Sequence, residues 1–279
     1  MKSFYIVTNP DKEGAFETEQ QIRDYLEGRD ARCASGSMTG SGDGRYTDSS
    51  QVPQEVDCVI TIGGDGTLIQ AARDLAGRNI PFIGVNRGHL GYLTQVSSVE
   101  ELREMLDALL SGRYHLEKRM MLQGLVVRDG RTVYENMALN EIVISRSGLL
   151  KPMHFRILVN GEFLNQYTAD GMIIATPTGS TAYNLSAGGP IVAPSARMMV
   201  LTPICSHALN SRSIVLPAED EITVEMLDEG HIVSFDGNLS GEIRQTDKII
   251  IRQAGMDTTL VQLKKISFLQ NLSSKMTGV

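Results

Sequence analysis

A glycine-rich turn that contains one acid is the first feature of this sequence that could do chemistry. The turn lies between an apolar run at residues 59–62 and a helix-like run at 68–76, and consists of Gly63, Gly64, Asp65, Gly66 and Thr67. Glycine lets the backbone approach a phosphate group closely, and the start of a helix offers unpaired N–H donors. The turn lacks the Gly-Lys-Ser/Thr of a Walker A loop and the third glycine of a dinucleotide fingerprint. It therefore indicates a phosphate site of another kind.

The acid in this turn points to proton transfer. A carboxylate repels phosphate groups, so Asp65 makes chemical sense if it accepts a proton from an attacking hydroxyl group. The alternative is a structural turn in which Asp65 caps the following helix. Asn is also a good cap, so the capping interpretation predicts that Asp65→Asn preserves both rate and stability. The proton-transfer interpretation predicts a large loss of rate with stability little changed.

Two further motifs carry groups that recognise sugars and amides. Asn140 and Glu141 open an apolar run at residues 142–144, and an amide beside a carboxylate can bind sugar hydroxyls or base edges. For this dipeptide alone, a solvated strand start is the alternative. The third motif begins at Asp170 and continues through a buried-type strand into a long turn. That turn is dense with hydroxyl groups, which belong to Thr176, Thr178, Ser180, Thr181, Tyr183 and Ser186.

The first half of the chain has the pattern of an α/β domain that would position the glycine-rich turn. Strand-like runs at residues 4–8, 56–62 and 80–85 alternate with helix-like runs. The clearest helix has apolar residues on one face, and Ser98 and Glu101 form a capping-box pattern before it. Its apolar face consists of Leu102, Met105, Leu106, Leu109 and Leu110. Alternating strands and helices predict a parallel sheet, in which ligands bind at the carboxyl ends of the strands. Residues 35–50 are rich in Ser and Gly and predict a mobile loop.

The pattern changes to an all-β one after residue 118. From residue 121 to 251 the apolar runs are short and strand-like, and turn residues separate several of them. We therefore predict an α/β nucleotide-binding domain over residues 1–118 and a β-rich domain over 119–259, with a separate sheet in each. The strand-like runs are 122–127, 141–145, 155–159, 172–176, 213–216, 222–226, 231–235 and 248–252.

Composition excludes several classes of protein. A net charge of −7 argues against a general nucleic-acid binder, which would present a basic face. The chain has neither a run of ~20 apolar residues nor an apolar leader, so we expect a cytoplasmic protein without a membrane span. No Cys/His cluster with metal-ligand spacing is present, so we expect no metal ion bound by the protein alone.

In their order along the chain, these motifs resemble those of bacterial NAD kinases. The resemblance extends from about residue 56 to 240 and includes residues 63–67, 86–92, Asn140–Glu141, Asp170–Gly171 and 176–183. The Gly-Gly-Asp-Gly-Thr element is shared with lipid and sphingosine kinases, whereas the Thr-Pro-Thr-Gly-Ser-Thr-Ala-Tyr element is highly specific. The resemblance implies an enzyme that transfers the γ-phosphoryl group of ATP to the adenosine-ribose 2′-hydroxyl of NAD, which gives NADP.

The resemblance also implies roles for individual residues. Asp65 would accept the proton of the 2′-hydroxyl, in a phosphate loop formed by Gly63, Gly64, Gly66 and Thr67. Asn140 and Glu141 would hold adenine and ribose groups, and Lys151 would meet ligand at a subunit contact. Asn238 stands where many relatives have Gln or His. The other implied substrate-binding residues are Gly66, Tyr92, Asp170, Thr181, Ala182, Tyr183 and Ser186.

The same resemblance implies the cofactor and the partners. A divalent metal ion, with Mg²⁺ the expected species, would be held largely by substrate phosphates. NAD and ATP, or in some members polyphosphate, would be the substrates, and the protein would be a homodimer or homotetramer. Residues from about 260 to 279 would return to the first domain. Two alternatives are a lipid or sphingoid-base kinase and a non-catalytic nucleotide sensor. The polar motifs argue against the first, and the acid at position 65 argues against the second.

Overall fold

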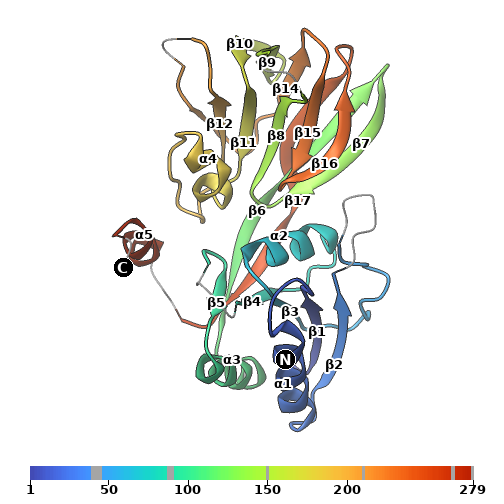
Figure 1. The fold of residues 1–279 in the computed structure, drawn as a ribbon, viewed down its shortest axis with the longest axis vertical. Helices are drawn as coiled ribbons and strands as arrows, with labels where there is room; N and C mark the ends of the chain where they lie inside the picture. Colours follow the sequence, from blue (N-terminus) through green and yellow to red (C-terminus); the bar gives the residue numbers. More distant parts are fainter. Residues whose placement is uncertain (39–45, 87–90, 149–150, 209–210, 265–267, 278–279) are drawn as a thin grey trace. The chain divides into compact units, whose positions relative to one another are not determined.

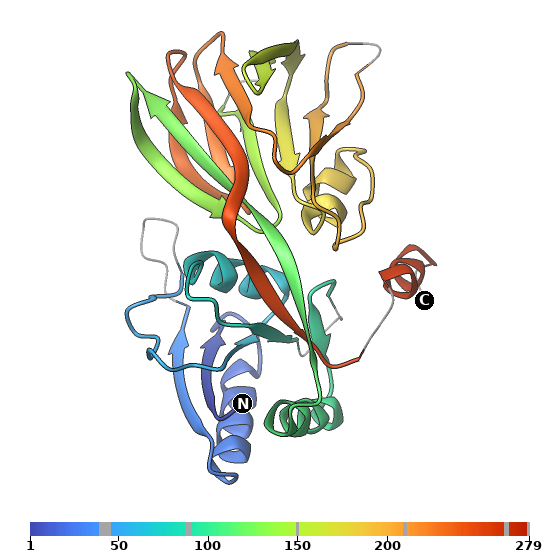
Figure 2. The same cartoon turned by 180° about the vertical axis from the view of Figure 1, so that it is seen from behind.

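The structure is a computed structural model that describes all residues except 39–45, 87–90, 149–150, 209–210, 265–267 and 278–279. The chain divides into two compact units (Figures 1 and 2). Unit 1 consists of residues 1–118 and 258–279, and unit 2 of residues 119–257.

Unit 1 is a parallel sheet with helices on both faces. The strand order is β2-β1-β3-β4, and both β5 and the end of β17 pair with β4. Strands β1 and β3 are buried along their whole length, as expected for strands covered on both sides. The strands are β1 (Ser3–Thr8), β2 (Arg32–Ser37), β3 (Cys58–Ile62), β4 (Phe82–Val85) and β5 (Thr94–Val96).

The helices that cover the sheet of unit 1 are α1 (Ala15–Glu27), α2 (Asp65–Asp74) and α3 (Val99–Ser111). Helices α1 and α3 share one apolar cluster with Ile83 of β4, so they cover the same face of the sheet. Gly84 lies on the opposite face, against Leu68 of α2. The predicted capping box of α3 is confirmed, because Glu101 N–H donates to Ser98 Oγ and Ser98 N–H donates to Glu101 Oε2.

Unit 2 contains two antiparallel layers. One is a six-stranded sheet with the order β13-β12-β11-β8-β15-β16, and the other is formed by β6, β7, β9, β10, β14 and β17. Buried side chains of both layers, such as Ile144 and Phe155, belong to one core cluster, as in a β-sandwich. The first sheet comprises β8 (Glu141–Arg146), β11 (Gly171–Ala175), β12 (Met198–Ile204), β13 (Ile214–Pro217), β15 (His231–Phe235) and β16 (Asn238–Ile243). The other strands are β6 (His115–Arg128), β7 (Arg131–Ala138), β9 (Met153–Val159), β10 (Glu162–Ala169), β14 (Ile222–Met226) and β17 (Lys248–Gln262).

The expectation of a separate sheet in each half is wrong. Strand β17 pairs with β14 at Ile222↔Ile251 and with β4 at Leu260↔Phe82, so one hydrogen-bonded ladder is continuous along this strand. The sequence predicted only residues 122–127 of β6 and residues 248–252 of β17, where the strand-like pattern of side chains is clearest. Backbone pairing extends these strands to 14 and 15 residues. A helix, α5 (Phe268–Thr277), follows β17.

The predicted loop at residues 35–50 is also partly wrong. Residues 35–37 belong to β2, which pairs in parallel with β1 from Ser3↔Arg32 to Thr8↔Ser37. This strand has no alternating apolar pattern, because it lies at the edge of the sheet and is held by backbone hydrogen bonds. Residues 39–45 of the predicted loop lie outside the described residues.

Candidate active site

The glycine-rich turn joins the end of β3 to the start of α2. Gly63 and Gly64 connect Ile62 to Asp65, which is the first residue of the helix. A Cβ atom built on Gly64 or Gly66 would meet no atom within 4 Å, so the backbone here is open to the approach of another molecule. The first N–H groups of an α-helix have no partner within the helix. The turn therefore presents backbone donors at the carboxyl end of a parallel strand.

Thr67 holds this turn from within the fold. Its side chain is buried, and its hydroxyl accepts a hydrogen bond from Asn9 Nδ2 at 3.3 Å. Its N–H donates to Gly64 O at 3.0 Å. Thr67 is thus engaged in supporting the predicted phosphate loop.

The carboxylate of Asp65 is held by the segment that leads into β5. Oδ2 accepts from Tyr92 N–H at 2.6 Å, and Oδ1 accepts from Leu93 N–H at 3.2 Å. Thr94 donates to Oδ1 twice, through its N–H at 3.0 Å and its hydroxyl at 3.1 Å. Oδ1 therefore accepts three of these hydrogen bonds and Oδ2 one. The proposed capping role is wrong, because Gly64 is the N-cap of α2 and Asp65 binds a different segment.

Gly91 and Thr94 make this contact possible. A Cβ atom on Gly91 would overlap the carboxylate of Asp65, so only glycine fits there without a shift. The buried hydroxyl of Thr94 also accepts from Gly91 N–H at 2.9 Å and so links both sides of the contact. Tyr92, predicted near adenine, contributes its backbone N–H to Asp65 and has a partly exposed side chain. The neighbouring residues 87–90 of that motif lie outside the described residues.

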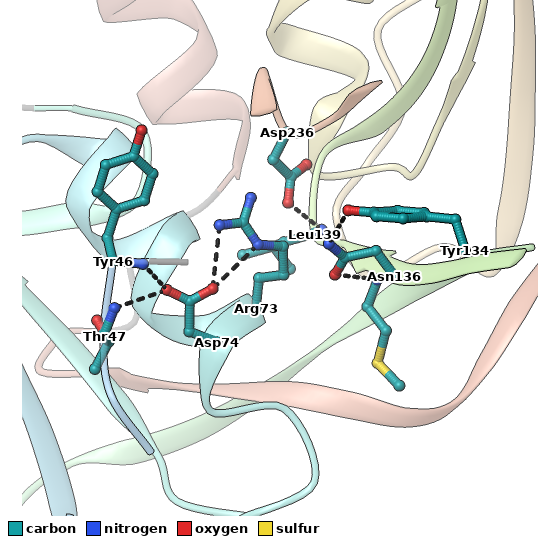
Figure 3. Close-up of polar contacts among 9 residues, drawn as sticks. Tyr46, Thr47, Arg73, Asp74, Tyr134, Asn136, Leu139 and Asp236 are labelled. Carbon is teal, nitrogen blue, oxygen red and sulfur yellow. Dashed lines mark hydrogen bonds and ion pairs between the residues drawn. The ribbon is translucent and has the colours of Figure 1, made fainter. Parts of the chain in front are cut away.

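The far end of α2 is anchored as well. Asp74 accepts from Tyr46 N–H at 2.8 Å and from Thr47 N–H at 2.9 Å, and it forms a fully buried ion pair with Arg73 at 3.1 Å (Figure 3). The helix that begins with Asp65 is therefore tied to the rest of unit 1 at both ends.

In unit 2, Asn140 and Glu141 lie where β7 passes into β8, and Asp236 binds the backbone there. Its Oδ2 accepts from Leu139 N–H at 2.7 Å (Figure 3). Its Oδ1 accepts from Asn140 N–H at 2.8 Å and from Glu141 N–H at 3.1 Å. In the sequence, Asp236 directly follows the strand-like run 231–235 and is one of the turn residues that separate such runs, so this role was missed.

The side chain of Glu141 is buried, with 7% of its surface exposed. Among the described residues, its Oε2 atom has no hydrogen-bond partner. Burial raises the pKa of Glu141, and the negative charge of Asp236 raises it further, to about 8. A buried carboxyl group with an unused oxygen and a pKa near the working range is typical of a binding or catalytic site. The alternative of a solvated strand start is wrong.

The hydroxyl-rich turn packs directly against this segment. Thr176 donates through its hydroxyl to Leu139 O at 2.6 Å and through its N–H to Asn140 O at 2.8 Å. A Cβ atom on Gly179 would overlap the backbone of Asn140, so the close approach requires glycine. The turn and the Asn140–Glu141 pair thus form one structural group.

The structure divides the hydroxyl groups of the turn into two sets. Thr176, Thr178 and Ser180 are buried, and Ser180 donates to Pro177 O at 2.7 Å. The residues predicted to bind substrate are instead partly or fully exposed, on the helical turns that follow: Thr181, Ala182, Tyr183 and Ser186. The second set is the one available to a ligand.

Asp170 is not brought to this group. Sheet register pairs Glu141 with Ala175 at one end of β11, whereas Gly171 pairs with Ser145 at the other. At ~3.4 Å per residue, the ends of this strand are about 14 Å apart. Asp170 forms an ion pair with Arg146 at 3.2 Å, at the end of β8 that precedes the exposed Lys151. Asn238 begins β16, and its side chain lies outside the described residues.

The described residues offer no protein-only metal centre. Among them, no group of three or more His, Cys, Asp or Glu side chains is placed to hold a metal ion. In the described part of the chain, no helix is long and apolar enough to cross a bilayer.

Comparison with known proteins identifies similar chains. Residues 4–114 match the family model described as ATP-NAD kinase N-terminal domain, and residues 139–263 match the ATP-NAD kinase C-terminal domain. The NAD kinase of Lachnospira eligens is 43% identical, over 99% of this chain and 100% of that protein. The NAD kinase of Lachnoclostridium phytofermentans is 39% identical, over 99% of both chains.

Two solved structures share the fold. Yeast NADH kinase complexed with NADH superposes with a TM-score of 0.88 at 24% identity, over 99% of this chain and 88% of that one. An NAD kinase from Archaeoglobus fulgidus in complex with ATP superposes with a TM-score of 0.77 at 24% identity, over all of both chains.

Proposed function

Since this chain belongs to the NAD kinase family of phosphotransferases, we propose that it phosphorylates the adenosine-ribose 2′-hydroxyl of NAD with ATP. The observation that carries the proposal is Asp65, whose carboxylate is fixed beside the open backbone of Gly64 and Gly66. In the reaction, the 2′-oxygen forms a bond to the γ-phosphorus as the bond from that phosphorus to the β-γ bridging oxygen breaks. ADP leaves, and the hydroxyl proton passes to Asp65.

The hydrogen bonds of Asp65 support Oδ2 as the atom that accepts the proton. Oδ1 accepts hydrogen bonds from Leu93 and twice from Thr94, whereas Oδ2 accepts one from Tyr92. A carboxylate oxygen has room for about two acceptor interactions, so Oδ2 retains capacity for the substrate hydroxyl. Holding the base rigidly in this way lowers the entropic cost of reaching the transition state.

For substrate binding, we propose the roles that the resemblance implies. The backbone donors of Gly64 and Gly66 would bind phosphate groups, with Gly63 and Thr67 supporting the turn. Asn140 and Glu141 would bind adenosine, and the exposed residues Thr181, Ala182, Tyr183 and Ser186 would complete that site, with Tyr92 and Asn238 contributing further contacts. A divalent ion, most simply Mg²⁺, would be held largely by the phosphates of the substrates and would neutralise their charge.

A direct assay tests the proposed reaction. Incubation with ATP, Mg²⁺ and NAD should yield NADP, measured with a strictly NADP-dependent dehydrogenase, in an amount equal to the ADP formed. Diacylglycerol or sphingosine in place of NAD should yield no ADP above background. ADP formation with either lipid would favour the lipid-kinase alternative, and NAD binding without any turnover would favour the sensor.

We also propose that the protein is a cytoplasmic homodimer or homotetramer. The side chain of Lys151 is exposed, which supports the ligand contact between subunits that the resemblance implies for it, while Asp170 would line the NAD site. Light scattering at micromolar concentration should therefore give at least twice the 30.5 kDa of one chain. A mass of one chain under these conditions would rule out this assembly.

A further inference from the structure

Asp236 makes more contacts with the Asn140–Glu141 segment than a hairpin turn requires. Besides accepting from three consecutive N–H groups, it donates its own N–H to Glu141 O at 3.1 Å. Its backbone has a φ of 49°, a left-handed conformation that Asp adopts more readily than most residues. This conformation places backbone and side chain of one residue on the same segment.

These contacts leave the segment little freedom. The Thr176 hydroxyl and N–H bind the carbonyl groups of Leu139 and Asn140, while Asp236 binds their N–H groups. Gly179 also packs against the backbone of Asn140. Since the backbone is held on both sides, the directions of the Asn140 and Glu141 side chains depend on Asp236.

The same carboxylate acts on Glu141 through its charge. Glu141 is buried and its Oε2 has no partner among the described residues, so its ionised form is poorly stabilised. Of the described residues, Asp236 is the only charged group that acts on the pKa of Glu141, which burial and this charge raise to about 8. The other residues that bind the segment, Thr176 and Gly179, are uncharged.

We propose that Asp236 is a positioning residue of the NAD site, which orients Asn140 and Glu141 and couples NAD binding to proton loss from Glu141. The inference rests on the proposed role of this pair in binding NAD. Since burial and the charge of Asp236 raise the pKa of Glu141 to about 8, the protonated form predominates in the free protein below that pH. Ribose hydroxyl groups donate hydrogen bonds, which favour the ionised carboxylate. NAD binding therefore lowers the pKa of Glu141 and releases a proton, and NAD affinity rises with pH until about pH 8.

Calorimetry in buffers of different ionisation enthalpy tests the coupling. The wild-type protein should release close to one proton per NAD at pH 6.5 and almost none at pH 9. Its Kd should fall by up to about tenfold per pH unit from pH 6.5 to about pH 8 and level off above that pH. Glu141→Gln removes the titrating group, so its Kd should not change with pH and its proton release should disappear.

Asp236→Asn separates this role from simple support of the fold. Loss of the charge should lower the pKa of Glu141, so that Kd stops changing with pH at a lower pH than in the wild-type protein. Loss of one hydrogen-bond acceptor should weaken NAD binding at pH 9 by about tenfold. Asp236→Glu keeps the charge but displaces the carboxylate. It should keep the pH profile of the wild-type protein while binding NAD more weakly. A purely structural role predicts instead that Asp236→Asn and Asp236→Glu have the same pH profile.

The outcomes distinguish this inference from the proposed function. If the wild-type protein binds no NAD at any pH, the assignment of the site fails. If NAD binds with no proton release, or if Asp236→Asn and Asp236→Glu both keep the wild-type pH profile, the role of Asp236 is overturned. If Asp236→Asn does not fold, Asp236→Glu still decides the question, because loss of proton release in that variant contradicts the coupling.

Discussion

Asp65→Asn should lower kcat by at least about 10²-fold while NAD remains bound. General-base catalysis usually contributes ~10²–10⁴-fold, and an amide of nearly the same shape cannot accept the proton of the 2′-hydroxyl. The variant also removes a negative charge beside the phosphates, so the affinity for ATP should hold or rise. Steady-state kinetics and calorimetry on the same preparation would measure kcat and the two Kd values.

The structure changes the expected effect of this variant on stability. The Asp65 carboxylate accepts hydrogen bonds on both oxygens, whereas the amide of Asn has only one oxygen that accepts. The NH₂ group of Asn cannot accept a hydrogen bond, so at least one backbone N–H group that binds Asp65 would lose its acceptor. We therefore expect a lower melting temperature for Asp65→Asn, in contrast to the small change that a helix-capping or purely catalytic role predicts.

Thr94→Val is the matched control for the loss of support. Val has nearly the same shape as Thr, so this variant keeps the carboxylate of Asp65 in place. It removes the Thr94 hydroxyl, which donates to Asp65 Oδ1 and accepts from Gly91 N–H. One net hydrogen bond to a charged group is worth about 1.5–3 kcal/mol. The control should therefore lower the melting temperature, with a smaller loss of kcat than that of Asp65→Asn. Equal losses of kcat in the two variants would mean that Asp65 acts through its position and not as the base.

Glu141→Ala should weaken NAD binding by about 10- to 150-fold at pH 9, where the carboxylate is ionised in the wild-type protein. Hydrogen bonds to a charged acceptor are worth roughly 1.5–3 kcal/mol. At pH 6.5 the carboxyl group is protonated before NAD binds, since its pKa is about 8. The loss should then be at most about 5-fold, because releasing the proton at this pH costs about 30-fold in affinity. KM for NAD at both pH values measures the difference.

The fold should survive this change. A glutamate whose pKa is higher in the folded than in the unfolded state lowers the free energy of unfolding as the pH rises. For Glu141 this decrease extends from the ordinary pKa of a glutamate to about pH 8. The isosteric variant Glu141→Gln should therefore melt at the same temperature as the wild-type protein or higher at pH 9. Glu162→Ala, at an exposed glutamate on β10, is the matched control and should leave KM unchanged. An unchanged KM in Glu141→Ala at both pH values would exclude Glu141 from the NAD site.

Features that depend on local patterns could be predicted from the amino-acid sequence. The apolar face of α3 and its capping box are encoded within a few neighbouring residues, and the structure confirms both. The glycine-rich turn was predicted between a strand and a helix, and it joins β3 to α2. Strands β14 and β15 were predicted with the bounds that the structure gives, because each is a short strand-like run between turn residues. The order of the motifs was enough to indicate the family.

The contacts that hold the candidate site, and the pKa of Glu141, could not be predicted from local patterns. The donors to Asp65 lie 27 to 29 residues away in the chain, and those to Asp236 lie 95 to 97 residues away. No local pattern encodes such contacts, since they arise when distant segments are brought together by sheet pairing. The edge strand β2 and the extensions of β6 and β17 were missed for the same reason, because backbone pairing fixes them without a side-chain signal. The pKa of Glu141 depends on burial and on a carboxylate 95 residues away in sequence, so it is a property of the folded chain alone.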